Sequence, residues 1–287
     1  MDTLTTISPT TCEGRLTLES GVPVSSDDQS AKTTLYFSPY KGNVIDLYSG
    51  SYWVRRVFTE RSLPLSGLTA SLPYDIFGYD NSGTVTLEAL AWTNATTRAT
   101  VLTTQDGVLA KSGTTTRRYL GTVYVNSSGG QTDDTVGRRY LWNYYNRVAR
   151  PMQVLESTNS WTYTTQTWRQ ANGAAGNQLD FVIGVLEDSV DAEVLTAAKN
   201  SSSGLNVNVA VGLDSTSTPS TACIRPKTHV PAANLPFNVV ARWRGFPGVG
   251  RHTLVWLEIS DAAGATTWYG DDGGADVTSG ITGLVIG

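Results

Sequence analysis

The fold class is decided by three consecutive pieces of sequence: Tyr74-Asp75-Ile76-Phe77-Gly78-Tyr79, then Asp80-Asn81-Ser82-Gly83, then Thr84-Val85-Thr86-Leu87-Glu88-Ala89-Leu90-Ala91-Trp92. In the two longer pieces apolar and polar residues alternate, which is typical of strands with one buried face. The middle piece is rich in Asn, Ser and Gly, which suit tight turns. The pattern predicts two short strands joined by a turn, the repeating unit of an antiparallel sandwich.

The same pattern recurs on both sides of this unit and predicts an all-β chain with two antiparallel β-sandwich domains. Residues 1–32 read as an extended N-terminal arm with one strand candidate, Arg15–Glu19. Residues 33–137 are expected to form a fibronectin-III- or Ig-like sandwich with a hairpin extension. Residues 138–151 form a junction rich in aromatic residues and Arg, and residues 152–287 form a jelly-roll-like sandwich.

A tyrosine corner is predicted at the start of the deciding unit. Leu68 precedes Tyr74 by six residues, and Tyr74 opens an alternating strand. In sandwiches of the fibronectin-III type, such a tyrosine hydroxyl bonds back to the backbone a few residues upstream. The alternative is an ordinary Tyr at the start of a strand.

Composition supports the same fold class and excludes several functions. With 287 residues, the chain is long enough for about two domains. Only 16% of residues are charged, whereas Thr contributes 39 residues and Gly 28; Thr favours strands and Gly favours turns. The net charge of −4 offers no global field for nucleic acid. No apolar run approaches the roughly 20 residues of a membrane span.

The first residues and the cysteines indicate assembly inside a cell. Residues 1–11 show neither a basic nor an apolar region, so no secretion signal is expected there. Cys12 and Cys223 allow at most one disulfide. Because a cytoplasm is reducing, both are expected to be free thiols.

Residues able to carry catalysis are sparse, so the chain is expected to be non-enzymatic, with no catalytic residues, no metal and no cofactor. The acidic doublets, expected to be solvated loop acids, are Asp27-Asp28, Asp133-Asp134 and Asp271-Asp272. The loop 271–276 is rich in oxygen ligands but lacks the spacing of an EF-hand. His229 and His252 are expected to be structural, because neither has a Ser or Cys arrangement typical of a triad.

The densest aromatic segment of the chain is 138–151, which is predicted to be a domain junction or a subunit interface. Tyr, Trp and Arg are the residues enriched at such contacts. An internal core strand is the alternative, and stacking of nucleic acid is disfavoured by the acidic chain. The candidate interface residues are Arg139, Tyr140, Trp142, Tyr144, Tyr145 and Arg147.

A second group of aromatic residues lies in the C-terminal half and has two interpretations. Exposed aromatic rings can stack on the apolar faces of sugars. The same residues can instead belong to the core of a sandwich. The candidates for glycan stacking are Trp161, Trp168, Trp268 and Tyr269.

Several strings of the chain resemble structural virion proteins of tailed bacteriophages and prophages, which are labelled as tail, fibre or unassigned virion components. The resemblance covers roughly residues 15–169 and two pieces near the end, and it matches least over 190–246. The strings that carry it are Thr34–Asn43, Tyr74–Phe77, Ala91–Asn94, Thr96–Arg98, Leu102–Val108, Lys111–Gly113, Arg117–Thr122, Leu141–Val148, Thr266–Asp271 and Ser279–Gly283.

The resemblance implies a tail- or fibre-associated virion protein that is anchored by its N-terminal part and projects or trimerises through its C-terminal domain. A capsid decoration protein or spike is an alternative within the same class. A carbohydrate- or receptor-binding module for host attachment is a second alternative. The expected partners are further copies of the chain in a homotrimer, other virion proteins of the tail, baseplate or capsid, and a host surface glycan.

Overall fold

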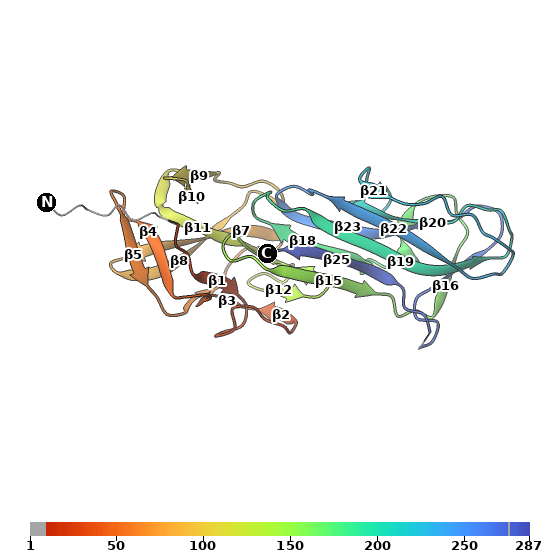
Figure 1. Ribbon diagram of the computed structural model, residues 1–287, viewed down its shortest axis with the longest axis horizontal. Coiled ribbons are helices and arrows are strands. Elements are labelled where there is room, and N and C mark those ends of the chain that lie inside the picture. The colour runs from red at the N-terminus through yellow and green to blue at the C-terminus, as the bar shows by residue number, and fades with distance from the viewer. Residues whose placement is uncertain (1–9, 275) are drawn as a thin grey trace.

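The computed structural model describes residues 10–274 and 276–287, and its regular elements are almost all β-strands. Within these ranges the one helical element is a 3-10 turn, η1 (Ala171–Gly173). The chain is all-β and is built from antiparallel sheets packed as β-sandwiches, as the sequence predicts. Figure 1 shows the early and the late strands gathered toward opposite ends of the long axis. In the described ranges, no helix has the length and apolar character to cross a membrane.

The N-terminal sandwich contains a three-stranded sheet, β1-β3-β6, a two-stranded sheet, β4-β5, and a larger sheet with the order β8-β7-β11-β10-β9. Strand β14 pairs with β11 beside this order. The bounds are β1 (Gly14–Thr17), β3 (Thr34–Pro39), β4 (Val44–Tyr48), β5 (Trp53–Val57), β6 (Arg61–Pro64), β7 (Leu72–Asn81), β8 (Thr84–Ala91), β9 (Leu102–Gln105), β10 (Val108–Lys111), β11 (Thr114–Val125) and β14 (Leu141–Asn143).

The C-terminal sandwich pairs an inner sheet, β17-β23-β18-β13-β12-β2 with β20 on β23, with an outer sheet, β15-β25-β19-β22-β21, to which β24 and β16 are added. From β18 onward the chain crosses between the two sheets at most connections, as in a jelly roll. The bounds are β2 (Gln29–Lys32), β12 (Thr132–Thr135), β13 (Arg138–Arg139), β15 (Ala149–Leu155), β16 (Ser160–Tyr163), β17 (Arg169–Gln170), β18 (Gln178–Ile183), β19 (Val190–Asn200), β20 (Asn208–Leu213), β21 (Cys223–Ile224), β22 (Phe237–Gly245), β23 (Gly250–Ile259), β24 (Thr266–Tyr269) and β25 (Gly280–Ile286).

Strands β7 and β8 form the hairpin that the sequence predicts. Their register runs from Tyr74 opposite Ala91 to Asn81 opposite Thr84. The two residues between the strands, Ser82 and Gly83, both have positive φ angles. Such a turn matches the right-handed twist of the strands that it joins.

The tyrosine corner is also present as a hydrogen bond. The Tyr74 hydroxyl accepts the backbone N–H of Thr69 at 2.7 Å, and the Tyr74 ring is buried. This contact ties the chain before β7 to the start of the strand.

Strands β7 and β11 are buried on both faces, because their sheet lies between two cores. Ile76 and Leu120 pack in the N-terminal core, whereas Phe77 and Tyr119, their neighbours in the chain, pack in the C-terminal core. Adjacent residues of a strand point to opposite faces. The sheet is therefore a layer shared by the two sandwiches.

The two sandwiches are also interleaved along the chain, which corrects the expected domain boundaries. Strand β2 pairs with β12, and β13 pairs in parallel with β18, so residues 29–32 and 132–139 complete a C-terminal sheet. Strand β1 pairs with β3 of the N-terminal sandwich. Residues 10–32 are therefore folded into both sandwiches instead of forming a free arm, and residues 1–9 lie outside the described residues.

The Tyr74→Phe variant removes the corner hydrogen bond and leaves an N–H without its acceptor. We expect a loss of about 1 kcal/mol in the free energy of unfolding, measured by urea denaturation. Tyr79→Phe is the matched control on the same strand, because in residues 10–274 and 276–287 no hydrogen bond of the Tyr79 hydroxyl is found. Equal losses in the two variants would contradict a special role for Tyr74.

Candidate functional site

The junction segment 138–151 lies between the two sandwiches and forms β13, β14 and the start of β15. Arg139, Tyr140 and Trp142 are buried, so within this chain they offer no surface to a second subunit. Trp142 packs in the C-terminal core, while its neighbour Leu141 packs in the N-terminal core. The aromatic segment therefore joins the two cores of one chain.

The remaining candidate interface residues are partly buried and also have partners in the same chain. The Tyr145 hydroxyl accepts a hydrogen bond from Arg118 at 3.1 Å. Arg147 pairs with Glu187 at 2.6 Å and with Asp188 at 2.5 Å. The Tyr144 ring lies 5.7 Å from that of Tyr119. These contacts bind the junction to both sandwiches.

A buried carboxylate, Asp134 on β12, is shared by two arginines of the junction. Its oxygens lie 3.0 Å from Arg139 and 2.7 Å from Arg150. Arg150 also donates to the backbone oxygen of Ser25 at 2.9 Å, and Arg139 to that of Pro151 at 2.7 Å. The prediction that Asp133-Asp134 are solvated loop acids is wrong, because both are less than 10% exposed.

A third arginine, Arg15 on β1, clamps distant segments through backbone oxygens alone. It donates to Pro23 at 3.0 Å, to Asn146 at 2.7 Å and to Gly287 at 2.7 Å. Burial, together with the nearby positive charge of Arg150, lowers the pKa of Arg15 to about 10. The group still carries its charge at neutral pH.

The contact between the two sandwiches is called the seam. At another point of this seam, Arg98 joins the shared sheet to the C-terminal sandwich. It pairs with the buried Asp75 at 2.6 Å and donates to the backbone oxygen of Gly184 at 2.6 Å. A Cβ at Gly184 would lie 2.1 Å from the Tyr119 hydroxyl and 2.4 Å from Trp142. Because only glycine permits this approach, the two sandwiches meet here without a gap.

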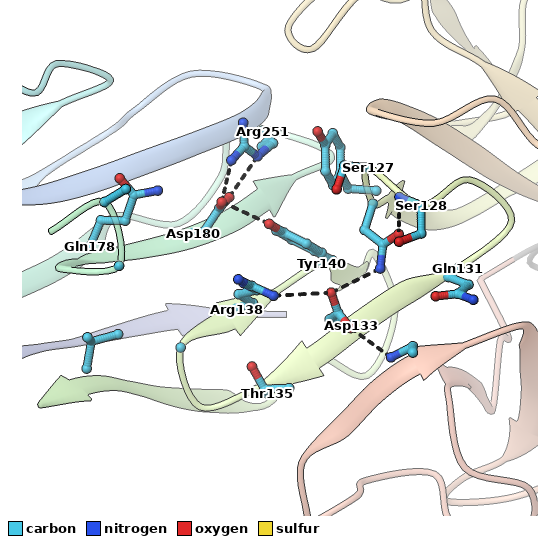
Figure 2. A pocket seen from close by; sticks show the side chains of 17 residues that line it. Ser127, Ser128, Gln131, Asp133, Thr135, Arg138, Tyr140, Gln178, Asp180 and Arg251 are labelled. Carbon is cyan, nitrogen blue, oxygen red and sulfur yellow. Dashed lines mark hydrogen bonds and ion pairs between the residues drawn. The ribbon is translucent and has the colours of Figure 1, made fainter.

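A polar pocket of about 550 Å³ opens on this seam, between β12, β13, β18 and the loop after β11. Its volume is within the range of small-molecule sites, although its lining is more polar than most. Figure 2 shows its side chains converging from both sandwiches. The polar residues that line it are Asn126, Ser127, Ser128, Gln131, Asp133, Thr135, Arg138, Tyr140, Gln178, Asp180 and Arg251.

The pocket is organised around Asp180, which is 4% exposed. Arg251 binds both of its oxygens, and the Tyr140 hydroxyl donates to it at 2.8 Å (Figure 2). Burial raises the pKa of Asp180, against the opposing effect of Arg251. Burial alone would lower the pKa of Arg251, but its hydrogen bonds to Asp180 raise it. The guanidinium therefore stays charged, and its bidentate contact favours the carboxylate form of Asp180.

The second carboxylate of the pocket, Asp133, is also engaged. It accepts the N–H of Ala31 at 2.8 Å and the side-chain amide of Asn126 at 3.2 Å. Arg138 lies 3.7 Å away and its side chain is 61% exposed, so its guanidinium is open to solvent. Both carboxylates thus act as acceptors for protein groups, while the pocket presents donors.

The chemistry of the lining suits a ligand rich in hydroxyl or carboxylate groups. In the described residues no acceptor is found for Nη1 of Arg251, and Arg138 has donors to spare. Guanidinium groups recognise carboxylates in a bidentate way. Hydroxyl and amide side chains, such as those of Ser128 and Gln178, add neutral donors and acceptors.

The residues expected to stack on a glycan do not form one exposed aromatic face. Trp268 is fully buried and Trp161 is 8% exposed, and both belong to the C-terminal core. Trp168 and Tyr269 are partly exposed. Arg225 lies over the Trp168 ring and Lys199 over the Tyr269 ring. The core interpretation holds for Trp161 and Trp268, so the four-residue platform is wrong.

The pocket has no compact signature in the sequence, because its residues lie on separate segments of the chain. One signal in the sequence could have indicated part of the pocket. Asp133-Asp134 is followed by Arg138-Arg139, and acidic and basic pairs of this spacing can face each other across a hairpin.

Cys12 and Cys223 are both free and buried. No group of three or more His, Cys, Asp and Glu side chains arranged to hold a metal is found in residues 10–274 and 276–287.

The comparisons with known proteins leave the chain without an assigned family. No family profile and no curated protein matches it. The solved structures that match include the insecticidal delta-endotoxin Cry8Ea1 from Bacillus thuringiensis, at 6% identity over 96% of this chain and 52% of that one, with a TM-score of 0.28. BuGH86wt in complex with neoagarooctaose matches at 9% identity over 91% of this chain and 34% of that one, with a TM-score of 0.26. Scores this low carry no argument about fold or function.

Tyr140→Phe removes the hydroxyl that donates to Asp180 and so tests how much this hydrogen bond contributes to stability. Because the bond joins a buried hydroxyl to a charged group, we expect the free energy of unfolding to fall by about 1.5–3 kcal/mol. Tyr163→Phe is the control, since its hydroxyl bonds to the backbone of Thr167 at an exposed position. A urea midpoint unchanged by Tyr140→Phe would show that the buried bond contributes nothing.

Proposed function

We propose that the protein is a non-enzymatic structural component of a tailed-phage virion, associated with the tail or fibre. The resemblance of strings such as Thr34–Asn43 to virion proteins supports this role. The observation that carries it is the interleaved seam, in which β2, β12 and β13 from the first half of the sequence complete the inner sheet of the C-terminal sandwich. Two sandwiches joined in this way are expected to behave as one body, which suits a structural component. In this role the N-terminal sandwich anchors the protein and the C-terminal sandwich projects from the particle.

The proposal predicts that the chain is found in purified particles. Virions induced from a host that carries the gene would be purified by density gradient, and their proteins identified by mass spectrometry. Peptides from the chain are expected in the particle band, and gold-labelled antibody is expected to mark the tail. Label on the head would instead support the alternative of a capsid decoration protein. Absence of the peptides from intact particles would contradict a virion role.

A second candidate function, attachment to a host glycan, is favoured by the seam pocket. Its two guanidinium groups and its hydroxyl lining suit an acidic sugar unit. This site replaces the aromatic platform expected from the sequence. It is compatible with a virion role, because an attachment protein is also part of the particle.

Glycan attachment predicts retention on bacterial polysaccharides that contain uronic or sialic acid. Arg138→Gln is expected to weaken this retention at least tenfold, because it removes an exposed donor of the pocket. Arg225→Gln, which changes an arginine outside the pocket, is expected to bind as the unaltered protein does. Equal retention of both variants, or no binding to any acidic polysaccharide, would contradict the glycan function.

A further inference from the structure

The outer sheet of the C-terminal sandwich has one face that nothing in the described chain covers. In β19 buried and more exposed residues alternate, and β22 follows the same pattern. In contrast, β18 and β23 of the inner sheet are buried on both faces along most of their length. The inner sheet is thus enclosed at β18 and β23, while its partner presents a broad face of side chains to solvent.

This outer face carries large apolar residues, although an alternation of buried and exposed positions would normally place polar residues there. They lie on β15, β25, β19 and β21, which are four of the five strands in the order β15-β25-β19-β22-β21, and Figure 1 shows β15, β25, β19 and β22 running side by side. The exposed apolar residues are Leu155 at 50%, Leu284 at 38%, Leu195 at 47% and Ile224 at 79%. An apolar group of this kind rimmed by charges is typical of a protein–protein contact.

The charges of the face are sorted by strand. Asp191 and Glu193 lie on β19, and directly opposite them in the register lie Arg244 and Arg242 on β22. Leu195 and Val240 form the next cross-strand pair of this face. At this end of the strands β19 is therefore acidic and β22 basic at the same height, and ion pairs within the chain already join the two rows.

We propose that this face binds a second copy of the chain, face to face, about a twofold axis that runs along the strands. Such an axis places β19 of each copy over β22 of the other. The acidic strand then meets a basic strand on both sides of the axis, and Leu195 meets the partner near its Val240. A twofold contact requires a self-complementary surface, which this sorting of charge supplies.

The size of the face fits a reversible pair. With the axis between β19 and β22, β25 lies over the partner's β21, so four strands at about 4.8 Å spacing and seven residues at about 3.4 Å rise give an overlap of about 19 by 24 Å. The buried area would be about 450 Å² per partner, below the roughly 800 Å² of a standard interface. We therefore expect a pair whose population depends on concentration. It differs from the threefold assembly expected from the sequence, and it does not depend on the virion role.

Light scattering and sedimentation over a range of concentrations test this pair. The full-length protein is expected to approach twice 30.8 kDa as concentration rises from micromolar to submillimolar. The double variant Leu195→Lys, Leu284→Lys is expected to stay at 30.8 kDa, while Val57→Lys, at a 69% exposed position of β5, is expected to pair normally. A constant monomer, a trimer mass, or pairing by the double variant would overturn the proposal.

A mixing experiment separates this geometry from any effect on folding. One variant carries Asp191→Lys and Glu193→Lys, so that its face is wholly basic. Another carries Arg242→Glu and Arg244→Glu, so that its face is wholly acidic. Each is expected to be monomeric alone, and the two together are expected to form a heterodimer. If pairing is not restored on mixing, the crossed arrangement of β19 and β22 is wrong.

Discussion

The rest of the structure depends on one buried carboxylate, that of Asp134, and on the two arginines that share it. Through Arg150 it is connected to the backbone at Ser25, and through Arg139 to the start of β15. These groups come from the N-terminal segment, from β12 and from the junction. Removing one partner of a buried ion pair costs about 3–5 kcal/mol, because the other charge is left without compensation. The cluster therefore fixes how the segments of the seam are joined.

The two sandwiches are held together along the seam by apolar packing as well as by ion pairs. The sheet that contains β7 and β11 contributes to two cores, and Trp142 and Leu141 send adjacent side chains into different ones. Gly184 allows the sandwiches to approach closely beside the Arg98–Asp75 pair. The polar pocket lies on the seam, where side chains of the two sandwiches leave a space between them. A rigid body with an outward sheet face and a seam pocket suits a structural component that can also hold a ligand.

The sequence predicted the parts of the fold that arise from local pattern. The β7–β8 hairpin follows from alternation around Ser82-Gly83, and the Tyr74 corner needs only six residues of sequence. The burial of Asp133 and Asp134 could not be predicted in this way, because their partners include Arg150, Ala31 and Asn126. Only the fold brings these groups together. The role of residues 10–32 was missed for the same reason, since β1 and β2 pair with distant strands.

The central claim is that the two sandwiches form one cooperative body, and differential scanning calorimetry of the full-length protein tests it most directly. If the seam couples them, unfolding occurs in a single transition whose calorimetric enthalpy equals its van't Hoff enthalpy. Asp134→Asn should then lower the temperature of that single transition. Two separate transitions in the unaltered protein, each with its own enthalpy, would contradict the account.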